Sequence, residues 1–416
     1  MNQQNETVNT MCAKNIKFID VGQGDCTLLQ TEREKEGKKL DVYIDVGDGS
    51  RDISKFSNAE CVNIVLTHHH SDHVNGLEQL MRKKIGTVYL PFFANEIALI
   101  AKAVTHLKGF QYYERAHEVL HYFREICQCH DKVKERIDSL PDESKVVFLS
   151  EGVNADGGLE CLNPPKSPSA LNWVASVDMK TFFMELDRLF DKHFAEQLKA
   201  YFEFFCRTDN HEASYDVTNP LLKSVLASWI PDSKNQKELQ KEEQKIIGAN
   251  FVLSFLIENL QLLSEFNAVP DLETARQIEK KYKKLSHDMC IVLMAQIYDK
   301  KVLLTSDAST NIFERLMQQK RCIHSDYMKA PHHGSVKNIN RDILEAVAPK
   351  AVIISHGNRR FGRSKDSHPN SETLKLLADM NIQILTTRDI VKGSTVVIPK
   401  NAQKDFLKAN PIIEIE

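Results

Sequence analysis

The distribution of apolar runs along the chain constrains its fold more than any other feature. Residues 15–95 contain short apolar runs separated by glycine-rich turns, as in NIKFIDVGQGDCTLLQT and LDVYIDVGDG, and the run CVNIVLT is almost continuously apolar. Such runs predict strands that are covered on both faces, because a strand with one solvated face alternates apolar and polar residues. Strand patterns return from residue 289, in CIVLMAQIYDKKVLLTSDAS, AVIISHGN, NIQILTT and STVVIPK. We therefore expect a layered α/β domain built from two separate parts of the chain.

The region between these two parts has mainly helical periodicity. It includes a stripe of leucine, phenylalanine and tyrosine residues over 186–205, which we interpret as core packing rather than a base-stacking platform. One strand-like pair interrupts the helical pattern, in KVVFLSEGV and LECLNPP. We predict that residues 1–95 and 286–416 form the two halves of one fold. Residues 96–285 would then form a mainly helical insertion that contains a strand pair near 145–163.

The composition limits the compartment and the partners. The 416-residue chain has a formal net charge of -3, which excludes neither a polyanion nor a neutral partner. Its N-terminal residues lack the basic and apolar segments of a signal peptide, and its longest apolar stretch is interrupted at Glu258 and Asn259, so we expect no membrane span. Nine scattered cysteines favour reduced thiols. We expect a cytoplasmic protein.

Histidine and aspartate residues are concentrated in LTHHHSDHVNG, residues 66–76, directly after an apolar run. Successive residues of an extended chain face opposite sides, so His68 and His70 would point to one side and His69 to the other. Asp72 and His73 follow where the chain turns into a helix, and they can face a neighbouring centre. A metal that activates water needs imidazole and carboxylate ligands with one position left open. The stretch therefore predicts a metal site.

Several motifs together resemble a known family. THHHSDH matches the HxHxDH signature of the metallo-β-lactamase fold, and the remaining motifs resemble the hydrolase domain of the ComEC-type DNA-uptake proteins, in the order of that branch. These motifs are DVGQGD (20–25), IDVG (44–47), LLTSDA (303–308), KAPHHGS (329–335), IISHGN (353–358) and SHPN (367–370). The resemblance covers roughly residues 15–95, 145–165 and 286–400. It implies an αββα sandwich with a one- or two-metal site at its edge.

The resemblance also implies a ligand set. His68 and His70 would bind the first metal, Asp72 and His73 would bind the second, and Asp307 would bridge both through its two oxygens. A serine precedes this aspartate where most of the family has glycine, which costs backbone freedom but removes no ligand. Mixed imidazole and carboxylate ligands suit two zinc or two manganese ions.

Four further positions stay open at this stage. His287 is favoured as a ligand of the first metal, with Asp288 as its substitute. Of the two histidines in APHHGS, His333 is the favoured ligand of the second metal and His332 the assisting group, although the order could be reversed. Asp45 is expected to accept a hydrogen bond from the ring nitrogen of a ligating histidine that faces away from the metal.

The region 311–368 predicts a phosphate-binding surface. It contains eleven lysine and arginine residues against five acidic residues, a local excess of +6. The predicted substrate-binding residues are Lys329, Asn358, Arg359, Arg360 and Arg363. The catalytic candidates are Asp72, His332 and His368, the two histidines as proton donors or phosphate contacts.

These features favour a soluble metal-dependent hydrolase, a phosphodiesterase or nuclease that attacks DNA or RNA with a metal-bound hydroxide. One alternative is hydrolysis of a small ester, thioester, lactone or nucleotide messenger, because the fold does not fix the substrate. Another alternative is a component of a multiprotein system, in which the segment 166–285 binds a protein partner or a second copy of the chain.

Overall fold

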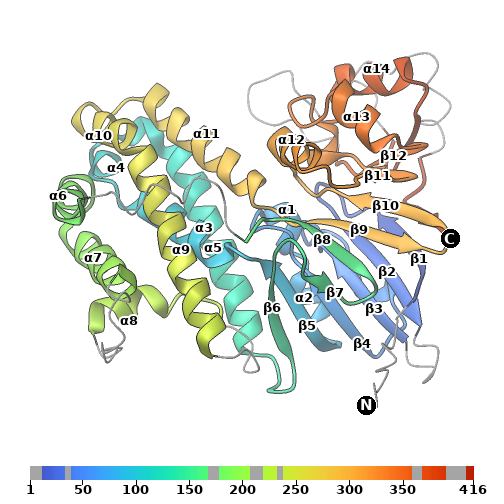
Figure 1. Cartoon of the computed structure of the whole chain (residues 1–416), viewed down its shortest axis with the longest axis horizontal. Helices are drawn as coiled ribbons and strands as arrows, with labels where there is room; N and C mark the ends of the chain where they lie inside the picture. Colours follow the sequence, from blue (N-terminus) through green and yellow to red (C-terminus); the bar gives the residue numbers. More distant parts are fainter. Residues whose placement is uncertain are drawn as a thin grey trace, which may run out of the picture. The chain divides into compact units, whose positions relative to one another are not determined.

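The computed structural model divides the chain into two compact units (Figure 1). Unit 1 comprises Met1–Pro91, Pro141–Pro164 and His287–Glu416, and unit 2 comprises Phe92–Leu140 and Pro165–Ser286. The structure describes residues 12–32, 39–166, 178–206, 219–231, 238–357, 368–389 and 409–416. The strand pair near 145–163 thus belongs to the same unit as the two strand-rich parts of the chain.

Unit 1 is an α/β domain, as the sequence predicts. Its strands are β1 (Cys12–Ile19), β2 (Thr27–Glu32), β3 (Lys39–Ile44), β4 (Cys61–Val65), β5 (Lys84–Pro91), β6 (Lys145–Leu149), β7 (Asn154–Ala155), β8 (Leu159–Asn163), β9 (Val292–Ile297), β10 (Lys300–Leu304), β11 (Tyr327–Lys329), β12 (Ala351–Ile354), β13 (Gln383–Thr386) and β14 (Ile412–Ile415). Among the described residues they follow the hydrogen-bonded order β13-β12-β11-β10-β9-β1-β2-β3-β4-β5-β6, with β14 beside β1, β8 beside β9, and β7 beside β8.

The sheet is mixed. The pairs β1-β2, β2-β3 and β9-β10 are antiparallel, whereas β3 to β6 and β10 to β13 run parallel to their neighbours. The helical elements of unit 1 are α1 (Ser71–Val74), α2 (Leu77–Leu80), α12 (Thr310–Gln318), α13 (Arg341–Val347), α14 (Ser371–Asp379) and the 3-10 turns Ser54–Phe56 and Pro331–Gly334. Parallel neighbours place the carboxyl ends of successive strands at one edge, where ligand-binding loops of α/β domains gather.

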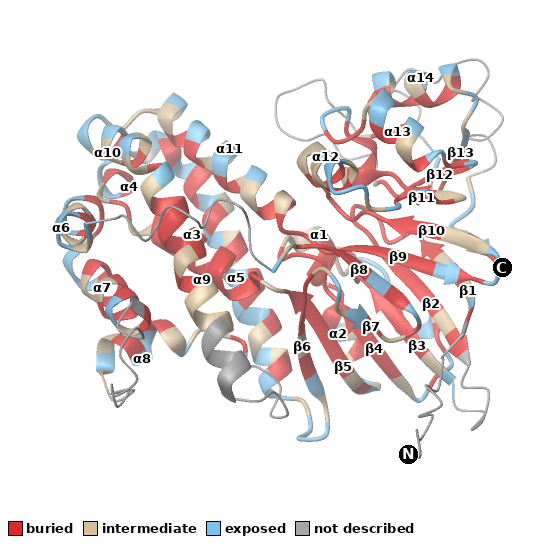
Figure 2. Ribbon diagram, viewed as in Figure 1, coloured by how far each residue is buried: buried red, intermediate tan, exposed pale blue. Residues whose placement is uncertain are grey.

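Alternate side chains of β9 pack into two different apolar clusters. Val292 and Met294 pack with side chains of α12, α13 and α14, whereas Leu293 and Ala295 pack with residues of β1 to β5, including Phe18. Figure 2 shows the strands of this unit buried along most of their length. The strands are covered on both faces, which explains why their sequences are almost continuously apolar. Burying each large side chain contributes about 1.5–3 kcal/mol.

Unit 2 is helical in its described residues. Its helices are α3 (Ala94–Thr105), α4 (Lys108–Tyr112), α5 (His117–Asp138), α6 (Met179–Leu189), α7 (Lys192–Cys206), α8 (Pro220–Leu226), α9 (Glu238–Glu258), α10 (Leu260–Ala268) and α11 (Leu272–Asp288), whose last two residues belong to unit 1; a 3-10 turn spans Glu114–Ala116. The stripe over 186–205 is buried, with Tyr201 and Phe202 fully inaccessible, so it forms core.

No single helix in the described part of the chain has both the length and the apolar composition of a membrane span. The segments Gln244–Glu258 and Leu260–Ala268 reach that composition only as a pair, and the pair is bent by 54°.

A glycine in the loop after β1 allows two loops to approach closely. Gly24 has a φ of +128°, and a Cβ atom there would overlap the carbonyl oxygen of Asp72. The amide of the next residue, Asp25, donates a hydrogen bond to that same carbonyl at 3.2 Å. The DVGQGD motif therefore needs glycine at this position both for its backbone angle and for the space.

Replacing Gly24 with alanine should destabilise the protein more than the same change at Gly152, which also has a positive φ but has no atom within 4 Å of an added Cβ. At Gly152 only the backbone angle is strained, at a cost of about 1–2 kcal/mol. Overlap at Gly24 should add about 1–3 kcal/mol. Urea unfolding followed by circular dichroism measures both variants. Equal destabilisation would show that the close approach to Asp72 is unimportant.

Candidate metal centre

The predicted ligands come from loops at the carboxyl ends of the strands. His68 and His70 follow β4, Asp307 follows β10, and His333 lies in the 3-10 turn after β11. His287 is in the last turn of α11. Segments far apart in the sequence therefore supply a single site in unit 1.

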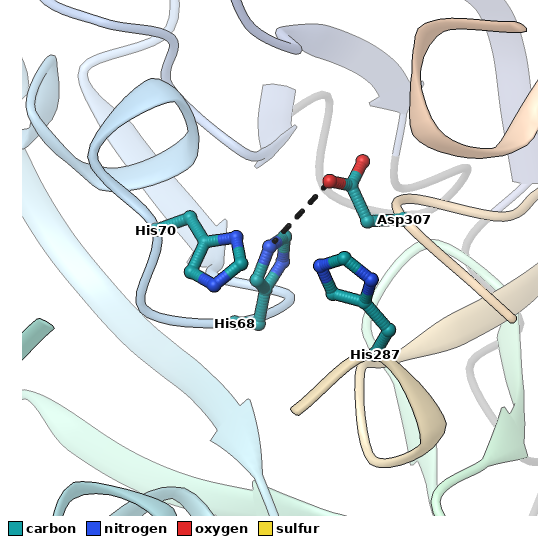
Figure 3. A group of neighbouring side chains, drawn as sticks. All are labelled: His68, His70, His287 and Asp307. Atoms are coloured by element: carbon teal, nitrogen blue, oxygen red, sulfur yellow. Dashed lines mark ion pairs between the residues drawn. The ribbon is translucent and has the colours of Figure 1, made fainter. Parts of the chain in front are cut away.

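One group of four side chains could hold a metal ion. The candidate ligand atoms of His68, His70, His287 and Asp307 all lie within 4.8 Å of one another (Figure 3). The Nε2 atom of His68 is 3.8 Å from Oδ2 of Asp307. Burial holds the pKa of His68 well below its usual value, so this imidazole is neutral, as a ligand must be. His69 is buried and belongs to none of the metal-binding groups of the described residues.

Two further groups lie beside the first. Asp72, His73 and His333 form one of them, with Nε2 of His333 3.2 Å from Oδ2 of Asp72. Asp25, His73 and Asp307 form the other. Because Oδ1 of Asp307 is 3.4 Å from Nε2 of His73, while its Oδ2 atom faces His68, this carboxylate is shared between the groups.

The residues behind the ligands fix the direction of their ring nitrogens. Nδ1 of His73 is 2.7 Å from Oδ2 of Asp45, and Nδ1 of His333 is 3.0 Å from the carbonyl oxygen of Ser355. A carboxylate and a carbonyl accept hydrogen bonds, so both histidines donate from Nδ1 and present Nε2 to the site. Asp45 also accepts hydrogen bonds from the amide and hydroxyl of Thr67, at 2.8 and 2.7 Å.

The electrostatics of the site favour added positive charge. Burial opposes protonation of His73, but Asp45 and Asp307 outweigh it and hold its pKa well above the usual value. Burial likewise opposes protonation of His333, but Asp25 and Asp72 raise its pKa to about 10. The buried Nε2 atoms of His68 and His73 have no hydrogen-bond partner in the part of the chain that the structure describes. Carboxylates in excess and buried nitrogen atoms without partners fit a site for cations.

Strained backbone is concentrated at this site. Of the eight non-glycine residues with positive φ in the described chain, four lie here: Asp45 at 55°, Ser306 at 48°, His332 at 48° and His333 at 54°. Each such residue costs about 1–2 kcal/mol. Ser306 is the serine that precedes Asp307, and glycine would adopt its positive φ at a lower cost. Strain of this kind persists where the surrounding structure over-determines a functional geometry.

The paired candidates for the open positions have different surroundings. The carboxylate of Asp288 accepts hydrogen bonds from Ser309 and Asn311 at the start of α12, whereas His287 lies in the group with His68. His333 is fully buried in the group with Asp72. His332 is 27% exposed, and its Nε2 atom is 3.6 Å from Oδ2 of Asp307.

Lys329 does not face solvent, and this affects its predicted role in substrate binding. It is 3% exposed, forms an ion pair with Asp25, and donates to the carbonyl oxygen of Ser306 at 2.9 Å. The Asp25 carboxylate, with a pKa lowered because Lys329 and His333 outweigh burial, was not singled out from the sequence. Its sequence signal was an acid that ends the DVGQGD motif, directly after a strand-like apolar run.

The remaining predicted substrate and catalytic residues are only partly placed. Asn358, Arg359, Arg360 and Arg363 lie outside the described residues. The ring of His368 is 5.1 Å from that of His332, and burial lowers the pKa of His368 to about 3, so the imidazole is neutral.

Comparisons with known proteins give a partial match. No protein-family model matches this chain. ComE operon protein 3 of Bacillus subtilis (strain 168) is 31% identical over 86 residues, which are 20% of this chain and 10% of that protein. The match spans about a tenth of that relative, so it supports a similarity of one segment.

Metal binding should release protons and should tighten as the pH rises. His73 and His333 have raised pKa values, so both carry a proton at neutral pH without metal, and a metal must displace that proton. We expect affinity for zinc to rise on the order of tenfold per pH unit for each proton displaced, between about pH 6 and 8. Calorimetric titration in buffers of different ionisation enthalpy measures the released protons.

The Asp45→Asn variant is the control for this prediction. It removes the carboxylate that holds the proton on His73, so fewer protons should be released and metal affinity should fall about 10–100-fold. Heats that do not depend on the buffer would contradict the assignment of protonated imidazoles.

Proposed function

We propose that this protein is a metal-dependent hydrolase of the metallo-β-lactamase fold that cleaves phosphodiester bonds in DNA or RNA. The observation that carries the proposal is the shared carboxylate of Asp307, whose two oxygens face imidazoles of different groups, those of His68 and His73. A carboxylate in this position could offer one oxygen to each of two neighbouring cations. Two cations suit attack on a phosphodiester.

The packing of unit 1 supports an αββα sandwich. One apolar cluster joins residues of β1 to β5 with residues of β9, β10 and β12, as two sheet faces in contact would. The other cluster joins the opposite side of β9 to β13 with helices α12 to α14. Helices thus cover one outer face of the C-terminal strands.

The charge balance supports two divalent cations. The site holds four carboxylates, those of Asp25, Asp45, Asp72 and Asp307, against the ammonium group of Lys329, which leaves three negative charges. In the protein without metal, two protonated imidazoles offset part of this excess. One divalent cation in exchange for these two protons would leave one negative charge, whereas two would leave one positive charge, which a hydroxide ion or the phosphodiester group of a substrate would neutralise. Zinc and manganese both suit the ligand types.

Bound cations would polarise the phosphoryl group and activate water. The chain would hold them with His68, His70 and His287 on one side and with Asp72, His73 and His333 on the other, and Asp307 would lie between. The loop geometry leaves room for water and substrate because Asp72 and His332 are partly exposed, with side-chain exposures of 20% and 27%.

His332 is suited to move a proton. The side-chain amide nitrogen of Asn338 donates to the carbonyl oxygen of Ala308 at 2.9 Å. The Oδ1 atom of Asn338 therefore faces Nδ1 of His332, at 3.3 Å. Nδ1 therefore donates, and Nε2 carries the lone pair on the side of Asp307. Burial lowers the pKa of His332, so the imidazole is neutral. It would accept at Nε2 the proton that the attacking water loses, and it would then deliver that proton to the leaving oxygen.

We further propose a nucleic-acid strand as the substrate and leave the segment 166–285 as a candidate surface for a protein partner or a second copy of the chain. The first proposal draws on the local charge excess of +6 over residues 311–368 and on the partial similarity to ComE operon protein 3.

Cleavage of labelled single- and double-stranded DNA and RNA tests the proposal. The protein loaded with zinc, manganese, magnesium or cobalt should cleave at least one of them, and Asp307→Ala should lower the rate by at least about a thousandfold because both groups of ligands lose a shared partner. Asp299→Ala, an exposed aspartate in the turn between β9 and β10, is the matched control and should retain activity. No cleavage with any of the metals would contradict the proposal.

A further inference from the structure

We propose that Arg51 and Arg388 form a subsite for a second phosphate of the nucleic-acid strand, beside the metal centre. The inference rests on the proposed function and deepens it, since it makes a polymeric strand, rather than an isolated phosphodiester, the preferred substrate. It is independent of the arginine-rich segment 358–367, which lies outside the described residues.

The two arginines share one buried carboxylate. Arg388 binds Asp20 with Nε at 3.1 and 3.2 Å and with Nη2 at 2.9 Å, and Arg51 binds the same carboxylate with Nη2 at 3.0 Å. The Asp20 side chain is only 5% exposed, whereas those of Arg51 and Arg388 are 41% and 31% exposed. The carboxylate thus holds two guanidinium groups together at the surface.

This arrangement leaves positive charge and donors for an anion. Among these three side chains, two guanidinium groups against one carboxylate give a net charge of +1. A guanidinium group has five N–H donors, and the contacts with Asp20 use only part of those on Arg51 and Arg388 in the described part of the chain. Paired guanidinium groups with fixed orientation suit the oxygens of a phosphate group, because the donors match its geometry.

The loop that carries Asp20 leads directly to the metal centre. Five residue steps separate Asp20 from Asp25, which belongs to a group that could hold a metal, so the two Cα atoms are at most about 18 Å apart. The loop is more compact than this limit, since the amide of Gly22 folds back to donate to Oδ1 of Asp20 at 3.0 Å. Phosphates of a strand rise about 3.4 Å per nucleotide, so one within about five nucleotides of the cleaved bond could reach the subsite.

A second path along the sheet gives the same placement. The amide of Thr387, the residue before Arg388, donates a hydrogen bond to the carbonyl oxygen of Ile354 at 3.2 Å. Ser355 follows Ile354 in the chain, and its carbonyl oxygen accepts the hydrogen bond from Nδ1 of His333. The guanidinium group of Arg388 therefore belongs to the same edge of the sheet as a metal ligand. The amide of Gly357, two residues after Ser355, donates to Oε1 of Gln23 at 3.2 Å. This hydrogen bond joins the segment after β12 to the loop that carries Asp20 and Asp25.

Binding of a fluorescent 12-nucleotide single strand, compared with a dinucleotide, tests the subsite by anisotropy in the presence of a chelator. Arg51→Gln and Arg388→Gln should each weaken binding of the 12-mer about tenfold at moderate salt. Affinity falls as the salt concentration rises, and each change should make the plot of log affinity against log salt concentration less steep by about 0.7. Arg51→Lys should restore part of the affinity, because it keeps the charge.

Lys84→Gln is the matched control. Lys84 has a side chain that is 59% exposed and pairs with Glu143 at 3.5 Å. It is the first residue of β5, so it lies at the opposite end of that strand from the edge that carries the metal ligands. The Lys84→Gln variant should bind the 12-mer as the unchanged protein does. If Arg51→Gln and Arg388→Gln also bind it unchanged, or if they lose no more affinity than Lys84→Gln, the subsite is refuted.

Two further measurements distinguish a phosphate subsite from a purely structural role of the arginines. If Asp20 only anchors the loop, Arg51→Gln would lower the melting temperature and reduce cleavage of the dinucleotide and of the 12-mer by the same factor, and this result would overturn the inference. The inference instead expects the ratio of kcat/KM for the 12-mer to that for the dinucleotide to fall about tenfold. Because binding is measured without metal, failure of the hydrolase proposal would leave the anisotropy test of the subsite intact.

Discussion

The carboxylate of Asp307 is the constraint on which the rest of the site depends. It is buried, follows the end of β10, and faces the imidazoles of His68, His73 and His332 at 3.4–3.8 Å. Burial disfavours its charge, but the surrounding histidines hold its pKa well below the usual value. An ionised carboxylate at this depth must be balanced by positive charge. Protons on neighbouring imidazoles supply that charge in the protein without metal, and cations would replace them.

The framework behind Asp307 is built to keep it in place. Ser306 is held at a positive φ, and its hydroxyl is 2.5 Å from that of Thr67, which in turn binds Asp45. The buried ammonium group of Lys329 contacts both Asp25 and the carbonyl oxygen of Ser306. Loops from distant parts of the chain are thus tied into one polar network, and the backbone strain of the site is offset by these contacts. Lys329 therefore links the loop of Asp25 to the loop of Ser306.

Much of the fold and part of the site followed from periodicity and spacing. Continuous apolar runs predicted an α/β domain from two separate parts of the chain, and the structure confirms that class. The HHHSDH stretch predicted a metal site, and its His68, His70, Asp72 and His73 lie in groups that could hold metal. The number and identity of the metals did not follow, because the same ligand types suit several ions.

The sequence by itself determined most of the segments that form strands, where the helical region lies, and which short motifs carry ligand-type residues, because these depend on local pattern. It did not indicate the short strands β11 and β14. Only the tertiary structure showed that neighbours such as His287 and Asp288, or His332 and His333, have different surroundings, since these depend on which partners each side chain meets across the fold. The ion pair between Asp25 and Lys329, and the joining of Arg51 to Arg388 through Asp20, likewise followed only from the fold. Residues 51 and 388 are separated by most of the chain, and only the folded backbone brings their charges to one carboxylate.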